Sequence, residues 1–91
     1  MSLETSTSQV DGDLLTAFIA GDREAMVELI NRHGRMVLRT CQRMLGQGAQ
    51  ADGTAQAVFV ALAGSAKRLR SEICLAAWLH RAAVLQARSE R

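Results

Sequence analysis

The basic residues of the C-terminal third carry the clearest chemical signal in this chain. Lys67, Arg68 and Arg70 lie within four positions of one another, and Arg81 and Arg88 follow in a stretch with helical spacing. Ammonium and guanidinium groups bind phosphate oxygens, so a loop and a helix that carry them in sequence form a surface suited to a nucleic-acid strand. The alternative is an ordinary solvated helix face, because such faces also collect charge.

One of the few aromatic residues, Trp78, lies close to these basic groups in the sequence. The chain has one tryptophan, two phenylalanines and no tyrosine. Trp78 falls at helical spacing with Leu75, Leu79 and Ala82, which predicts that it packs in the core. Stacking on a nucleic-acid base is the alternative role for an aromatic residue near a basic loop. Phe18 and Phe59 are also predicted to be core residues.

The distribution of charge supports a polyanionic partner for the C-terminal third. The whole chain has 11 Lys and Arg against 9 Asp and Glu, a formal net charge of +2. Residues 1–60 contain five basic and seven acidic side chains, whereas residues 61–91 contain six basic and two acidic ones. A polyanion is therefore expected to meet residues 61–91 first.

No set of polar residues in the sequence predicts catalysis or metal binding. His33 falls on an apolar helical stripe, where a hydrogen-bonded core histidine is expected, and His80 has no carboxylate or cysteine at helical spacing. Gly46 and Gly48 do not belong to a phosphate-binding glycine motif and are interpreted as a helix break. We therefore predict that the protein is not an enzyme and needs no metal or cofactor.

Cysteine usage and hydropathy predict where the chain resides. Cys41 and Cys74 lack metal-ligand spacing, and both are expected to be small buried apolar residues. No apolar run follows a basic N-terminus, and no stretch approaches the roughly 20 apolar residues that span a bilayer. These features predict a soluble, reduced, cytoplasmic protein that does not contact a membrane.

The N-terminal half is predicted to contain two helices. Asp11 or Asp13 is a candidate cap for a helix over about residues 13–20, after a Ser- and Thr-rich lead-in of residues 1–10 that is expected to be flexible. Gly21-Asp22 then ends this helix and begins the next, because glycine supplies a left-handed turn and aspartate caps. The second helix is expected to continue to about residue 45. The following residues form its predicted apolar stripe: Met26, Ile30, His33, Val37, Cys41 and Met44.

The C-terminal half is predicted to contain two further helices around the basic connector at residues 64–71. Asp52 or Thr54 is a candidate cap for a helix ending near residue 66, and Ser71 is one for the last helix. The predicted buried residues of these helices are Ala55, Val58, Phe59, Leu62, Leu75, Trp78, Leu79, Ala82 and Leu85. Four amphipathic helices with short links predict an all-α fold, a small four-helix bundle that forms a single domain over residues 11–91.

Taken in order, four segments resemble region two of a bacterial sigma factor of the extracytoplasmic-function subfamily. The first two comprise Asp13-Leu14-Leu15, Phe18, Gly21-Asp22 and Ala25, then Leu29, Arg32-His33, Val37 and Arg43-Met44-Leu45-Gly46. The last two comprise Ala51-Asp52, Gln56 and Val58-Phe59, then Trp78-Leu79-His80-Arg81-Ala82-Ala83. Each motif is common by itself, whereas the ordered set with its spacing over residues 11–91 is more specific.

The resemblance implies two partners and assigns residues to each. Region two of this family binds the clamp helices of the large subunit of core RNA polymerase, which implies a docking role for Asp52 and Gln56. It also captures the single-stranded minus-ten region of promoter DNA. By resemblance and charge, Lys67, Arg68 and Arg70 lie in the base-capture loop, and Arg81 and Arg88 would follow the strand along the last helix. An anti-sigma factor is a further partner of this class of proteins.

Several positions depart from the family pattern. Gly53 and Ala57 occupy positions where relatives usually carry acidic residues, and Val84-Leu85 replaces an Arg-Asn pair. These departures favour an alternative interpretation, a diverged helical protein-interaction module that does not bind DNA. The sequence also stops before a second helix-turn-helix domain, which indicates either a piece of a longer protein or a minimal module.

Overall fold

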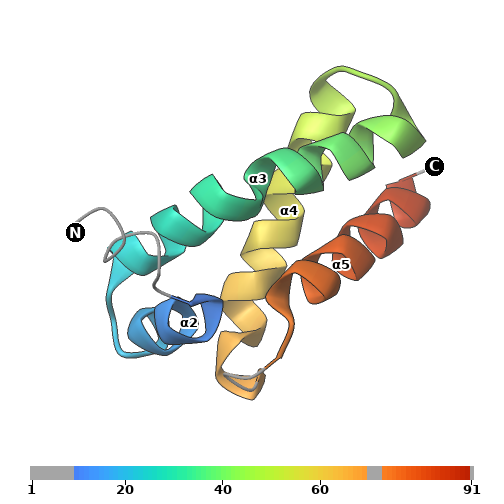
Figure 1. Cartoon of the computed structure of the whole chain (residues 1–91). Helices are drawn as coiled ribbons and strands as arrows, with labels where there is room; N and C mark the ends of the chain where they lie inside the picture. Colours follow the sequence, from blue (N-terminus) through green and yellow to red (C-terminus); the bar gives the residue numbers. More distant parts are fainter. Residues whose placement is uncertain (1–9, 70–72, 91) are drawn as a thin grey trace.

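A computed structural model describes residues 10–69 and 73–90, which fold into an all-helical bundle (Figure 1). The predicted role of Arg70, the predicted cap Ser71 and the lead-in up to residue 9 lie outside the described residues. The helices are α2 (Asp11–Ile19), α3 (Arg23–Leu45), α4 (Ala49–Ser65), the short 3-10 helix η1 (Ala66–Arg68) and α5 (Leu75–Glu90). The predicted all-α fold of four helices is thus confirmed.

The junction between α2 and α3 follows the predicted chemistry. Gly21 has a φ of +112°, which an L side chain rarely adopts, and its turn ends α2. The Asp22 side chain accepts a hydrogen bond of 3.0 Å from the Glu24 backbone N–H and caps α3. The prediction that Asp11 or Asp13 caps the first helix was wrong. Both lie inside its first turn after Val10, where a carboxylate interacts favourably with the helix dipole.

The core lies where α3, α4 and α5 meet, and its larger side chains come from all three helices. The fully buried side chains include Leu29, Val37, Cys41, Val58, Leu62, Leu79 and Ala83. On α3 the predicted stripe was partly wrong, because Leu29 is buried whereas Ile30 is 40 % exposed. The helix is long enough to contact α2, α4 and α5 in turn, so its buried face shifts around the axis along its length.

The start of α4 differs from the prediction. The helix begins at Ala49 after Gly48, so neither Asp52 nor Thr54 is its cap. Thr54 is instead buried inside the helix, and its hydroxyl donates a 2.8 Å hydrogen bond to the Gln50 carbonyl one turn earlier. This bond satisfies a polar group that would otherwise be buried without a partner.

Helix α5 packs on the bundle through small and branched side chains spaced four residues apart. Leu75, Leu79, Ala83 and Ala87 are buried, whereas Leu85 is 55 % exposed, which corrects its predicted place in the core. At the far end of α5, the Gln50 side-chain amide donates a 3.1 Å hydrogen bond to the Glu90 carbonyl. The end of α5 and the start of α4 therefore lie at the same end of the molecule (Figure 1). Among the described residues, no helix combines the length and apolarity needed to cross a bilayer.

Candidate nucleic-acid interface and docking groove

The basic turn after α4 is fixed to the bundle by its apolar residues. Ala66 at the start of η1 is buried and Leu69 just after η1 is partly buried, and the Leu69 N–H donates a 3.1 Å hydrogen bond to the Ala66 carbonyl. Lys67 and Arg68 lie between these two anchors and are exposed. Because η1 packs on α2 and α4, the two cationic groups are held at a defined place on the surface and project into solvent.

The basic residues of α5 lie opposite its buried side. Arg81 and Arg88 are exposed and seven positions apart, two turns along one face, while Leu79 and Ala83 on the other face are buried. His80 is exposed as well. None of these three side chains forms an ion pair with a described residue, so each is available to an outside ligand.

Trp78 packs against the core as a partly buried side chain. It lies one position before the fully buried Leu79 and one turn before the partly buried Ala82. Phe18 and Phe59 are also partly buried and contact the core. The predicted packing role of the three aromatic residues is therefore confirmed, although none of them is fully buried.

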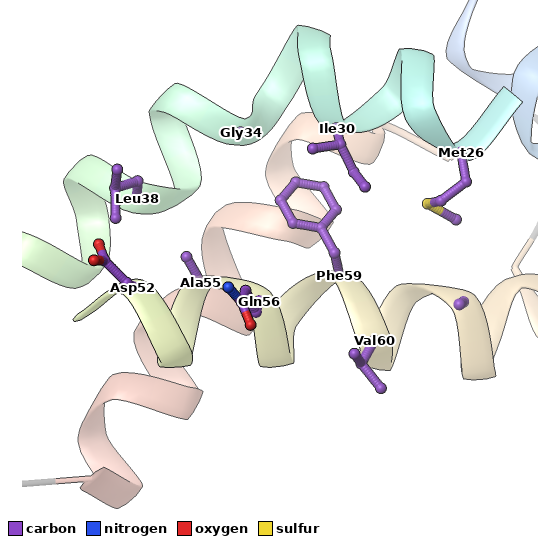
Figure 2. A pocket seen from close by; sticks show the side chains of 10 residues that line it. Met26, Ile30, Gly34, Leu38, Asp52, Ala55, Gln56, Phe59 and Val60 are labelled. Atoms are coloured by element: carbon purple, nitrogen blue, oxygen red, sulfur yellow. The ribbon is translucent and has the colours of Figure 1, made fainter. Parts of the chain in front are cut away.

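A second surface feature is an apolar groove between α3 and α4 with a volume of about 590 Å³ (Figure 2). The lining residues are Met26, Ile30, Gly34, Leu38, Asp52, Ala55, Gln56, Phe59, Val60 and Ala63. Figure 2 shows the Phe59 ring pointing from α4 toward Ile30 on α3. Val60, which also lines the groove, is 71 % exposed, and Ile30 on α3 is 40 % exposed, so the groove presents apolar side chains to solvent.

Asp52 and Gln56 supply the polar side chains of this groove. They are exposed and lie one turn apart on α4, so the structure brings the two predicted docking residues together. Asp52 sits near Leu38 at one end of the groove in Figure 2, and Met26 lies toward the other end. The groove thus offers an apolar floor with one carboxylate, which fits an amphipathic helix that carries a basic residue.

The α3 side of the groove was not predicted from the sequence. Met26, Ile30, Gly34 and Leu38 follow one another at intervals of four, and this spacing is a signal for a shared helix face. The predicted core stripe included Met26 and Ile30, because apolar periodicity does not distinguish a buried face from an exposed groove. A Cβ on Gly34 would meet only the Ile30 side chain, at 3.7 Å, so close packing does not require glycine there.

A polar cluster links α2 to α3. The His33 Nε2 atom lies 2.8 Å from an Asp11 carboxylate oxygen, and Arg32 contacts the other Asp11 oxygen at 3.4 Å. Arg32 also donates a 3.0 Å hydrogen bond to Glu28 one turn earlier. The predicted hydrogen bond of His33 is thus confirmed, whereas its side chain is partly buried and not a full core residue, and the sequence did not predict its partner on another helix.

The two cysteines occupy different environments. Cys41 is fully buried, and burial raises the pKa of its thiol. Cys74 is exposed, so the prediction that it is a buried apolar residue was wrong. Both are free thiols, and the described part of the chain contains no group of three or more potential metal ligands.

Comparison with known proteins places this architecture in a sequence family. The family described as Sigma-70 region 2 matches residues 29–91. The ECF RNA polymerase sigma factor SigM of one Mycobacterium tuberculosis strain is 32% identical over 74 residues, which is 81% of this chain and 38% of that protein. SigM of the Erdman strain is 31% identical over the same proportions. The chain thus spans well under half the length of these relatives, and no solved structure matches it significantly.

Proposed function

The chain belongs to the Sigma-70 region 2 family, and on that premise we propose that it is the promoter-recognition domain of an alternative sigma factor. In this proposal residues 11–91 form the domain. The groove between α3 and α4 docks on core RNA polymerase, and the basic turn with α5 holds the non-template strand of the minus-ten element. The observation that carries the proposal is that the groove is lined by α3 and α4, whereas the exposed basic residues belong to η1 and α5, so the two proposed sites share no residue.

The docking step is supported by the shape and chemistry of the groove. The clamp of the polymerase presents helices, and a helix buries its apolar side chains in a groove of this kind. Phe59, Ile30 and Val60 supply apolar surface, and Asp52 supplies a charge that would pair with a basic residue of the clamp. Because Gly53 and Ala57 carry no charge, apolar contact has a larger share in this docking than the family pattern implies.

The strand-binding step is supported by the exposed cations. Moving a base out of the duplex costs a few kcal/mol, and a pocket for the flipped base offsets that cost. Lys67 and Arg68, with Arg70 after them, would hold the phosphates beside that base, and Arg81 and Arg88 would hold those further along α5. In this proposal the protein reacts with neither partner, and its role is to position the strand on the polymerase.

Docking is tested by a pull-down of core polymerase with Asp52→Lys and with Asp13→Lys as the matched control. Both carboxylates are exposed and lie in the first turn of a helix, so both variants lose a similar interaction with the helix dipole. We expect Asp52→Lys to weaken the capture of polymerase and Asp13→Lys to leave it unchanged. Equal capture by both variants would remove the groove from the proposal.

Strand binding is tested by titration with a labelled non-template minus-ten oligonucleotide at two salt concentrations. We expect the triple change of Lys67, Arg68 and Arg70 to Glu to abolish strand binding while polymerase capture is retained. Lys67→Glu and Arg23→Glu form a matched pair, because both replace an exposed cation. Arg23→Glu is the control, since Arg23 lies at the start of α3 and is not among the residues proposed to bind the strand. If the folded parent chain binds no strand, the alternative of a protein-interaction module without DNA binding holds instead.

A further inference from the structure

Three arginines form an exposed ridge on α3 that neither proposed surface uses. Arg35, Arg39 and Arg43 are spaced four residues apart, so each is about 6 Å further along the helix axis than the last. All three are exposed. They are not among the residues that line the apolar groove, which uses Gly34 and Leu38 of the same helix. We call these three residues the arginine ridge.

The arginine ridge has no acidic partner within the described part of the chain. The contacts found there between acidic and basic side chains join Asp11 and Glu28 to Arg32 and His33. The ridge arginines follow Asp11 and Glu28 in the sequence, and they form no ion pair with either carboxylate. From residue 35 onward, the described residues include Asp52 and Glu90 as the acidic side chains, against seven basic ones. The guanidinium groups of the ridge are therefore available to an external anion.

The C-terminal end of the arginine ridge opens into a polar hollow of about 420 Å³. Arg39, Gln42, Arg43, Gly46 and Gln47 line it. These residues offer two guanidinium groups and two amide side chains, which are hydrogen-bond donors suited to phosphate oxygens. Arg43 also lies in the last turn of α3, where a cation stabilises the helix, and that role leaves its outer N–H groups free to bind a ligand.

The composition of the arginine ridge distinguishes between two kinds of anionic partner. Stable protein interfaces have an apolar centre, and the lining of this hollow includes no apolar side chain. An unpaired base is held in a pocket beside the phosphate contacts, and the lining of this hollow supplies no apolar or aromatic side chain for such a pocket. Contacts to the backbone of duplex DNA require only cations and other hydrogen-bond donors. The protein surfaces that make such contacts are polar and strongly basic, as the arginine ridge is.

The C-terminal end of the arginine ridge and the end of the last helix lie at the same end of the molecule. Arg43 and Arg88 lie in the last turns of α3 and α5, two helices that pack on each other. Both helices end at the same end of the molecule, where Gln50 contacts Glu90 (Figure 1). A DNA strand that follows α5 away from the basic turn would therefore arrive at the end of the molecule that bears the ridge.

We infer that the arginine ridge and its hollow bind the phosphate backbone of duplex DNA next to the melted segment. The inference rests on the proposed function and extends it, because it adds a contact that is independent of sequence and lies on a different helix. Three more neutralised phosphates would raise affinity and position the duplex without reading bases.

The test measures how tightly the same 91-residue chain binds two labelled probes over a series of salt concentrations. One probe is the minus-ten single strand, and the other is a duplex of unrelated sequence. We expect the triple variant Arg35→Gln/Arg39→Gln/Arg43→Gln to bind duplex on the order of tenfold more weakly, with a salt slope reduced by about 2 to 3, since each phosphate contributes about 0.9. Its binding of the single strand and its capture of polymerase should match those of the parent.

Three further variants make the result specific. Arg39→Gln should weaken duplex binding, whereas Arg23→Gln removes an exposed arginine of the same helix and should not. The triple change to Lys keeps the charge and should retain most of the salt slope, because counterion release depends on charge.

The two proposals fail in different measurements. Unchanged duplex affinity and slope in the triple Gln variant would overturn the inference, as would a parent chain that binds no duplex. A loss of polymerase capture in place of duplex binding would also overturn it and make the arginine ridge a protein contact. Loss of minus-ten binding by the parent chain, with duplex binding intact, would contradict the proposed function alone.

Discussion

His33 and Asp11 join two helices through one short contact. The Nε2 atom of His33 lies 2.8 Å from an Asp11 carboxylate oxygen, across 22 positions of sequence. Both side chains are largely shielded from solvent, with 14% and 26% exposure. The contact fixes α2 against the first half of α3, and α2 in turn packs on η1, which carries Lys67 and Arg68. The polar cluster thus supports the basic turn from a distance.

Removal of the Asp11 carboxylate should loosen α2. We expect Asp11→Ala to lower the free energy of unfolding by about 1 to 2 kcal/mol, because it removes the hydrogen bond with His33 and the ion pair with Arg32, both of which are partly exposed. Asp13→Ala is the control, since Asp13 is exposed in the same first turn and lacks a partner among the described residues. Urea titration gives both values, and equal losses would mean that only the helix dipole is involved.

Two leucines of α5 test the position of the core. Leu79 is fully buried and Leu85 is 55 % exposed, although both were predicted to face inward. Leu79→Ala should cost about 2 to 5 kcal/mol through lost burial and a cavity, whereas Leu85→Ala should change stability by less than about 0.5 kcal/mol. Thermal unfolding of the two variants measures the difference. Similar losses would mean that α5 is rotated about its axis relative to this structure.

Gly34 should tolerate alanine. A Cβ at this position meets only Ile30 in ordinary contact, so the variant avoids the cost of glycine in a helix without a clash. We expect Gly34→Ala to stabilise the domain by about 0.5 to 1 kcal/mol, measured by denaturant unfolding. A destabilised variant would show that the space between α3 and α4 at Gly34 is smaller than in this structure.

A larger side chain at Gly34 should affect docking. Gly34 lines the groove beside Ile30 and Leu38, so Gly34→Leu places new apolar volume in it. We expect polymerase capture to fall while binding of the minus-ten strand is unchanged. Comparison with Gly34→Ala in the same pull-down is the control, and retained capture by the leucine variant would exclude a partner side chain at this part of the groove.

The two thiols should differ sharply in reactivity. Cys74 is exposed, whereas Cys41 is buried and its raised pKa leaves less of the reactive thiolate at a given pH. Mass spectrometry after brief treatment of the folded chain with iodoacetamide should find one label, on Cys74, and denaturant should make Cys41 react as well. Rapid labelling of Cys41 in the native state would indicate that the core opens locally.

The sequence was sufficient for local features that depend on nearby residues. Gly21-Asp22 predicted a turn and a helix cap, because the left-handed backbone of the turn and the hydrogen bond of the cap both depend on residues a few positions apart. The basic turn followed from Lys67 and Arg68 themselves, since cations remain in solvent in any compact fold. The ordered motifs also indicated the family correctly.

The groove and the arginine ridge depended on how the helices meet. Periodicity marks the apolar residues of a helix, but the neighbouring helices decide which of them are covered: Leu29 became buried and Ile30 lines an open groove. Likewise, the sequence could not pair Asp11 with His33, because only packing of α2 on α3 brings positions so far apart together. Local chemistry thus determined the helices and their charges, and tertiary packing alone decided which faces remained exposed, because burial is a property of two surfaces in contact.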